Sequence, residues 1–213
     1  EDIPSYRRTI VEKVISDIEE LPQIVSITGP RRVGKTTALR QVICHLLDDK
    51  NIAPERILYF SFDDPEMFAS QELQKVIFDR IAAYAKEKGA SKETPFYFLL
   101  DEIQRLPRWE LFLKKYYDLK FPARFIISGS ASSPIFRSSQ ESLLGRIKDR
   151  HLLPFSFREF CLFKHRSEPD FEGSLPKPEE LRQLLLDEKA EDALKYLEQL
   201  DSKLSPFKNQ LTQ

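Results

Sequence analysis

The chain of 213 residues is 41% hydrophobic and 31% charged, which suits one large or two small domains around a hydrophobic core and excludes a wholly disordered protein. Its 33 basic and 34 acidic residues give a formal charge of −1, which offers no general attraction to nucleic acid or to an anionic membrane. Two cysteines, Cys44 and Cys161, are too few for a disulfide framework, so a reducing, cytoplasmic location is expected.

The N-terminal region has none of the features of a secretory or membrane segment. Residues 1–4 lack the basic start and apolar stretch of a signal peptide, and no apolar run approaches the roughly 18 residues that span a bilayer. We therefore expect a soluble chain without a membrane partner.

Apolar residues at helical spacing from Ile10 to Ile18 predict an amphipathic helix that ends near Leu21.

A phosphate-binding pattern follows this helix. A strand predicted at Gln23–Thr28 leads into a segment that fits the pattern G-x-x-x-x-G-K-[ST]. We call this segment the glycine loop; it reads Gly29-Pro30-Arg31-Arg32-Val33-Gly34-Lys35-Thr36-Thr37. The spacing then predicts a helix over Thr36–Asp49. Strand, loop and helix in this order indicate a phosphate site, because the N–H groups at a helix N-terminus bind phosphate oxygens.

The alternation of strands and helices continues after the glycine loop. It predicts helices around Leu73–Tyr84 and Trp109–Tyr117, strands at Ile57–Phe62, Phe96–Leu100 and Arg124–Ser128, and a weak fifth strand at Arg150–Leu153. Apolar strands separated by helices predict an α/β fold with a mostly parallel five-stranded sheet covered by helices on both faces, a three-layer sandwich. Leucines from Leu181 to Leu200 predict one or two further helices.

The domain limits follow from where apolar periodicity stops. We expect the core at residues 1–165, a linker rich in Pro, Glu, Ser and Gly at residues 166–178, and a small helical C-terminal segment at residues 179–213.

The glycine loop carries the residue types that a polyphosphate with Mg²⁺ needs. Gly29 and Gly34 let the backbone wrap around phosphate, Lys35 is expected to reach the β- and γ-phosphates, and the Thr36 hydroxyl is expected to bind Mg²⁺. Thr37 is expected near the α-phosphate, with an ordinary helix N-terminal threonine as the alternative. The other loop residues, Pro30, Arg31, Arg32 and Val33, are expected around the nucleotide, with exposed charge as the alternative for the two arginines.

Two carboxylates follow the strand at Phe96–Leu100 and are typical of a Walker B motif. We call Asp101 and Glu102 the acidic pair. Asp101 is expected to hold Mg²⁺ through a water, and Glu102 to polarise an attacking water. The alternative is a pair of acids at a helix N-terminus, which the glycine loop upstream disfavours.

Further candidates lie after the fourth predicted strand. Ser128 and Ser130 are candidate γ-phosphate sensors, although Ser-Gly-Ser also suits an ordinary turn. An ATPase transition state also needs a guanidinium near the γ-phosphate, often from a neighbouring subunit. Arg146 is the leading candidate, with Arg137 and Arg150 behind it and a solvated or ion-paired arginine as the alternative. A homo-oligomer with an arginine supplied in trans is thus one expected assembly.

Several segments resemble, in order and spacing, the prokaryotic AAA-type P-loop ATPases related to the signalling ATPases called STAND proteins. They are G-P-R-R-V-G-K-T-T from Gly29, L-L-D-E-I-Q from Leu99, S-G-S-A-S-S from Ser128, S-L-L-G-R from Ser142, and Leu153–Phe160. The similarity covers roughly Tyr6–Phe163. It implies a P-loop NTPase fold whose sensor strand lies between the loop strand and the Walker B strand. Family members continue into further domains, so we expect this chain, which lacks an initiator Met, to be an excised module or a shortened member.

The motifs together predict a protein that binds ATP and hydrolyses it with Mg²⁺, coupling nucleotide state to a protein partner or a downstream domain. The alternative is a nucleotide-gated signalling switch with little hydrolysis of its own. A small-molecule kinase is disfavoured by the glutamate after Asp101, and a GTPase by the absence of an N-K-x-D string. A DNA-loading role gains no support from the net charge.

Overall fold

The computed structural model describes residues 3–4, 6–63, 71–130, 143–164, 178–187 and 189–208. The chain forms two compact units, Glu1–Pro154 and Phe155–Gln213. Their boundary precedes a helix at Phe157–Lys164, whereas the sequence pattern extended the core to residue 165. The predicted linker falls, up to residue 177, outside the described residues.

The first unit alternates helices and strands along the chain. Its elements are α1 (Thr9–Glu20), β1 (Ile24–Gly29), α2 (Lys35–Cys44), a π-helical turn (His45–Asp49), β2 (Ile57–Ser61), α3 (Gln71–Glu87), β3 (Phe96–Asp101), α4 (Trp109–Asp118), β4 (Ala123–Ser130) and β5 (Ile147–His151). Each helix and strand predicted in this part of the sequence is present, with ends that differ by a few residues.

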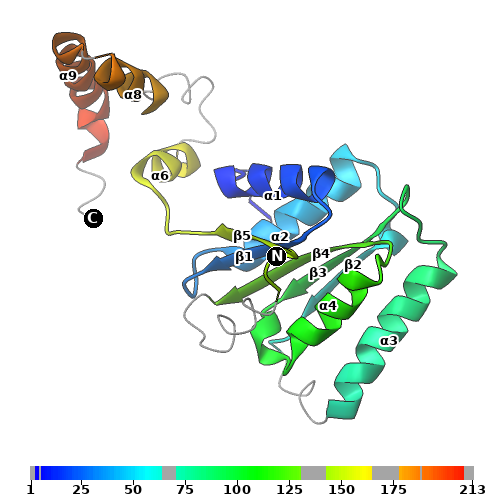
Figure 1. Ribbon diagram of the computed structural model, residues 1–213. Helices are drawn as coiled ribbons and strands as arrows, with labels where there is room; N and C mark the ends of the chain where they lie inside the picture. The colour runs from blue at the N-terminus through cyan, green and yellow to red at the C-terminus, as the bar shows by residue number, and fades with distance from the viewer. Residues whose placement is uncertain are drawn as a thin grey trace. The chain divides into compact units, whose positions relative to one another are not determined.

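The strands form one five-stranded sheet in the order β2-β3-β4-β1-β5. All four strand pairings are parallel, as Figure 1 shows from the common direction of the arrows. The strand β4 lies between β1 and β3, which confirms the order implied by the family resemblance. Because the strands are parallel, their carboxyl ends meet at one edge of the sheet, and the segments that follow β1 and β3 begin there beside the end of β4.

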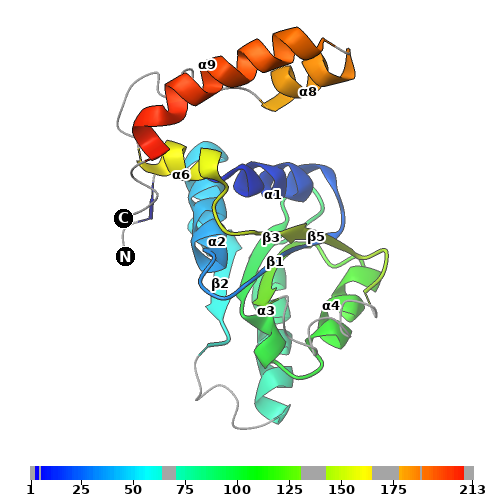
Figure 2. The ribbon, with the colours of Figure 1, turned by 90° about the vertical axis from the view of Figure 1, so that its left-hand side faces the viewer.

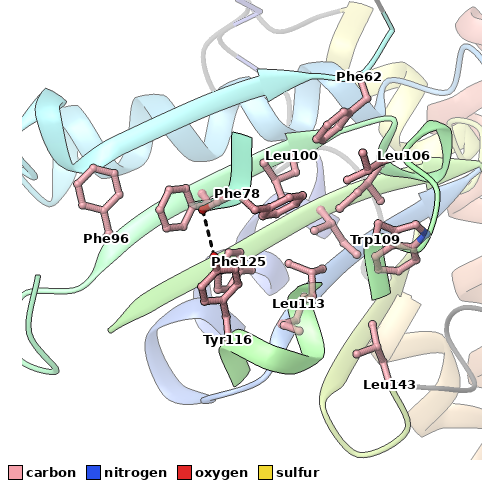
Figure 3. Packing of buried hydrophobic residues seen from close by; sticks show 14 of the residues in the cluster. Phe62, Phe78, Phe96, Leu100, Leu106, Trp109, Leu113, Tyr116, Phe125 and Leu143 are labelled. Carbon is pink, nitrogen blue, oxygen red and sulfur yellow. Dashed lines mark hydrogen bonds between the residues drawn. The ribbon is translucent and has the colours of Figure 1, made fainter. Parts of the chain in front are cut away.

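Helices cover both faces of the sheet, as expected for a three-layer sandwich. The helices α1 and α2 lie on one face (Figure 1), and α3 and α4 lie on the other (Figure 2). Under α1 and α2 the core is aliphatic and includes Val14, Leu39 and Val42. Under α3 and α4 it is aromatic (Figure 3): Trp109 is fully buried, and Phe78 stacks on Phe112 with ring centroids 4.7 Å apart. Burial of this apolar surface on both faces stabilises the sheet, because it removes the apolar side chains from water.

The strand β5 differs most from its prediction, because it begins at Ile147 rather than Arg150. It lies at the edge of the sheet and is partly exposed, so it lacks the apolar run that marks a buried strand. Its Arg150 forms two hydrogen bonds of 2.6 and 2.7 Å with the buried carboxylate of Asp17 on α1, and these bonds raise the pKa of Arg150. This ion pair ties the edge strand to the helix above it.

The second unit contains helices α6 (Phe157–Lys164), α8 (Pro178–Leu186) and α9 (Ala190–Lys208). The leucine pattern predicted α8 and α9 but not α6. The start of α6 carries a capping box, in which Ser156 Oγ accepts the Glu159 N–H at 3.2 Å and Glu159 Oε2 accepts the Ser156 N–H at 3.0 Å. In the part of the chain that is described, none of the helices has both the length and the apolar character needed to cross a bilayer.

Candidate functional site

The predicted site residues lie at the carboxyl edge of the sheet. In the register of the strands, Gly29 at the end of β1 pairs with Ser130 at the end of β4. Leu100 of β3 pairs with Ile127 of β4, one residue before Ser128. The glycine loop, the acidic pair and the two serines therefore come from three neighbouring strands, although they are distant in sequence.

The glycine loop connects β1 to α2 and requires glycine at both of its glycine positions. A Cβ atom on Gly29 would overlap the carbonyl oxygen of Leu152. Gly34 has φ 99° and caps the N-terminus of α2, a conformation that only glycine adopts without strain. Pro30, Arg31 and Arg32 between them are exposed. The loop thus presents its backbone at the start of a helix, as an anion site requires.

Lys35 is the first residue of α2 and is almost completely buried, with 4% of its side chain exposed. Its Nζ donates hydrogen bonds to the carbonyl oxygens of Pro30 at 3.0 Å and Gly29 at 3.5 Å. The same nitrogen lies 3.7 Å from Oε1 of Glu102. The side chain therefore folds back along the loop, and its charge faces the acidic pair.

Three hydroxyl groups donate hydrogen bonds to Asp101, which is 2% exposed. Thr36 Oγ1 and the Tyr59 hydroxyl reach Oδ2 at 2.7 and 3.1 Å, and Ser128 Oγ reaches Oδ1. Burial, with the negative charge of Asp101 beside it, raises the pKa of Tyr59, so its hydroxyl stays protonated as a donor. Hydroxyl and carboxylate oxygens are the ligands that Mg²⁺ prefers, and Thr36 and Asp101 fit that requirement.

Glu102 projects its carboxylate from a strained backbone position. Its φ of 52° lies in the left-handed region, which non-glycine residues seldom adopt and which clusters at functional sites. Its backbone N–H donates to Ser128 Oγ at 3.2 Å and to Asp101 Oδ1 at 3.1 Å. A quarter of its side chain is exposed. Glu102 is therefore the member of the acidic pair that water reaches.

Gln104 is a site residue to which the sequence analysis assigned no role, although it closes the L-L-D-E-I-Q segment. Its side-chain Nε2 donates a hydrogen bond to Oε2 of Glu102. A carboxylate only accepts hydrogen bonds, so this contact fixes which end of the amide faces Glu102. The opposite atom, Oε1, is buried and has no hydrogen-bond partner among the described residues. Gln104 thus holds a vacant acceptor beside the acidic pair.

Two other residues near the site also escaped the sequence analysis. Tyr59 belongs to the apolar strand β2, where its pattern indicated only a core residue. Arg8 precedes α1, and its guanidinium donates to the carbonyl of Val33 in the glycine loop at 3.2 Å and to that of Leu153 at 2.8 Å. The contact of Tyr59 with Asp101 and those of Arg8 join segments that are distant in sequence, and no local motif predicts them.

Among the described residues, the guanidinium groups of Arg146 and Arg150 are paired with acids other than the acidic pair. Arg146 forms an ion pair with Asp118, with Nε 2.8 Å from Oδ1, and hydrogen bonding with Arg146 lowers the pKa of Asp118. Its backbone carbonyl accepts the N–H of Ile24 at the start of β1, the end of that strand opposite the glycine loop. Arg150 is paired with Asp17, and Arg137 lies outside the described residues.

The remaining predicted residues lie as follows. Ser130 ends β4 and is 5% exposed, and Thr37 lies in the first turn of α2, half-buried.

Comparison with known proteins identifies related sequences. The model of a family described as "AAA domain" matches residues 21–161. Two uncharacterized proteins of Methanocaldococcus jannaschii, MJ1637 and MJ1544, are 34% and 31% identical over 70% and 79% of this chain. An uncharacterized protein of Haemophilus influenzae is 31% identical over 65% of the chain. The chain spans 30%, 35% and 33% of these three relatives, about a third of each.

Solved structures share the fold at low sequence identity. A closed-state structure of Hsp104 with ATPγS and FITC-casein has a TM-score of 0.53 and 15% identity, covering 98% of this chain and 39% of that chain. The extended conformation of the Saccharomyces cerevisiae Hsp104–casein complex has a TM-score of 0.50 and 17% identity, covering 76% of this chain and 29% of that chain. These likenesses concern the fold alone.

Proposed function

Because this chain belongs to the AAA domain family of P-loop ATPases, we propose that it binds ATP with Mg²⁺ and hydrolyses ATP to ADP and phosphate. One observation carries the proposal. The buried ammonium of Lys35, the Thr36 hydroxyl and the acidic pair meet at one edge of the sheet. A lysine, a metal-binding hydroxyl and a metal-binding carboxylate are the parts that P-loop enzymes use on ATP.

Binding would rest on the glycine loop and α2. The N–H groups at the start of α2 and the charge of Lys35 would bind the phosphate oxygens. Thr36 and Asp101 would hold Mg²⁺, which neutralises negative charge on the phosphates and on the leaving group when it is bound. Tyr59 and Ser128 support this step because their hydrogen bonds keep the Asp101 carboxylate in place.

Hydrolysis would rest on Glu102. A water attacks the γ-phosphorus, the bond from that phosphorus to the β-γ bridging oxygen breaks, and ADP leaves with the electron pair. The carboxylate of Glu102 orients the water and takes up its proton. Lys35 stabilises the charge that develops on the phosphate oxygens. The partial exposure of Glu102 supports this role, because the nucleophile comes from solvent.

The predicted sensor and arginine roles are proposals that depend on this reaction. Ser128 donates its hydroxyl proton to Asp101, and Ser130 pairs with Gly29 of the glycine loop in the sheet. This position beside the loop supports Ser130 as the sensor of the γ-phosphate. Arg146 lies at the other end of β1 from the glycine loop, so it would act only on a neighbouring subunit's nucleotide. A homo-oligomer in which Arg146 leaves Asp118 for that nucleotide is the arrangement we propose.

Gln104 gives a prediction specific to this site. The hydrogen bond from Gln104 Nε2 to Oε2 of Glu102 would orient the carboxylate toward the attacking water, so Gln104→Leu should lower kcat about tenfold, the equivalent of one lost hydrogen bond. The KM for MgATP should change less than about twofold, because Gln104 forms no hydrogen bond with a residue of the glycine loop in the described part of the chain. Steady-state kinetics beside the exposed control Gln199→Leu measures this. An unchanged kcat in Gln104→Leu would show that Gln104 has a packing role and no part in turnover.

The output of the reaction would be a change in a protein partner or a downstream domain. The chain spans about a third of the length of its relatives. We therefore propose that the partner is another domain of a longer protein. The free cysteines Cys44 and Cys161 support a cytoplasmic site of action. A nucleotide-gated switch is the second candidate, favoured by the contacts of Glu102 with Lys35 and Gln104, which restrain the carboxylate.

Phosphate release from ATP, measured over a series of protein concentrations with Mg²⁺ or with EDTA, tests the proposal. We expect Mg²⁺-dependent release. A rate that rises faster than linearly would indicate that a second subunit completes the site. Release no greater than in EDTA, with ATP still bound, would contradict hydrolysis and support the switch. Absence of ATP binding would overturn the nucleotide function altogether.

A further inference from the structure

A cavity of about 540 Å³ lies at the end of the sheet opposite the glycine loop. Its lining includes Gln23 and Ile24 at the start of β1, Pro95 before β3, and Ala123 and Phe125 of β4. Because all strands run in the same direction, these residues lie toward the amino ends of the strands, whereas the acidic pair follows the carboxyl end of β3. The volume is that of an ordinary small-molecule site, roughly 300–1,000 Å³.

Aromatic rings form the apolar part of the cavity. Tyr116 and Phe125 line it and are each 6% exposed; both appear within the buried cluster in Figure 3. Phe121 also lines the cavity, with its ring centroid 5.1 Å from that of Tyr116. Tyr117 lies beside them and is half-buried. Such a surface suits a flat apolar body, since rings stack or meet edge to face.

Basic side chains supply the charged part of the cavity. Lys92, Lys120 and Arg124 belong to the lining, and within the described ranges none of them forms an ion pair. The only acid among the lining residues is Asp118, whose charge is balanced by Arg146 at 2.8 Å. The cavity therefore has a net positive lining, which excludes cationic ligands and favours an anion.

We propose that this cavity binds a small organic anion with an aromatic or similarly flat apolar body. The body would pack on Tyr116, Phe121 and Phe125, and its acidic group would meet Lys92, Lys120 and Arg124. Gln23 adds a polar side chain to the lining. The proposal does not rest on ATP hydrolysis.

Two fluorescent probes with one ring system test the ligand class. 8-Anilinonaphthalene-1-sulfonate carries a sulfonate, and N-phenyl-1-naphthylamine is the same molecule without it. Titrated into the whole chain with saturating Mg²⁺ and ATPγS, the sulfonate should bind at one site and at least about fivefold more tightly than the amine. Equal affinities would indicate a neutral occupant, such as an apolar peptide segment, and overturn the anionic class.

Variants locate the site. Replacing Lys92 and Lys120 by alanine should weaken the sulfonate probe about fivefold and leave the amine probe unchanged, since only charge is removed. Tyr117→Ala should weaken both probes, because both lose ring contact. Lys13→Ala, on the exposed side of α1, serves as the control. An unchanged sulfonate affinity in the lysine double variant, an equal loss in Lys13→Ala, or binding of the probe only when nucleotide is left out would overturn the proposal.

Discussion

Lys35→Ala should lower the affinity for MgATP at least about 100-fold, the equivalent of roughly 2.7 kcal/mol of lost binding free energy. Its Nζ is buried and donates hydrogen bonds to the carbonyl oxygens of Pro30 and Gly29, so Lys35 provides a buried positive charge within the loop. Hydrogen bonds from an ammonium to phosphate are each worth about 1.5–3 kcal/mol. Calorimetric titration with MgATPγS measures the loss directly.

Lys50→Ala provides the matched control for this variant. Lys50 is an exposed lysine paired with Glu19 at 2.8 Å, and its removal should leave nucleotide affinity unchanged. Thermal unfolding of both variants without nucleotide separates lost binding from lost folding. An undiminished affinity in a folded Lys35→Ala protein would contradict the assignment of the glycine loop as the nucleotide site.

Glu102→Gln should keep ATP bound and unhydrolysed, with phosphate release at least about 100-fold slower than in the wild type. Glutamine has nearly the same shape and still accepts a hydrogen bond from Gln104, but it no longer takes up a proton at the reacting water. Affinity should hold or rise, because Lys35 loses a competing carboxylate 3.7 Å away. Quenched-flow phosphate release, with chromatography of the bound nucleotide, gives both quantities.

Glu55→Gln is the control for the second variant, since Glu55 is an exposed acid in the 3-10 turn before β2. It should match the wild type in binding and turnover. Normal turnover in Glu102→Gln would mean that a residue other than Glu102 is the general base. The two main variants also differ in the property they lose. Lys35→Ala should lose nucleotide binding, whereas Glu102→Gln should lose turnover and keep binding.

The central strands and the main site motifs were predictable from the sequence, for a local reason. The buried strands β1 and β3 are apolar runs, and the glycine loop follows one of them while the acidic pair ends the other. Each signal lies within a few consecutive residues. The edge strand β5 was less predictable because solvent on its free side permits Lys148 and Asp149, which interrupt the apolar run.

The contacts that complete the site were not predictable, because they depend on strand order. Tyr59 reaches Asp101 only because β2 pairs with β3, and Ser128 reaches it only because β4 lies on the other side of β3. Periodicity gives the face of a strand but not its neighbours in the sheet. Family resemblance supplied the order of the strands and left the role of Gln104 undetermined.

The left-handed backbone of Glu102 sets folding stability against activity at one position. A side chain in this region costs roughly 1–2 kcal/mol relative to glycine, so glycine at residue 102 would relieve backbone strain while removing the carboxylate that the proposed reaction requires. A library screened only for thermal stability should therefore discard Glu102, whereas one screened for ATP turnover should retain it. The residue present is the one that folding alone would not select.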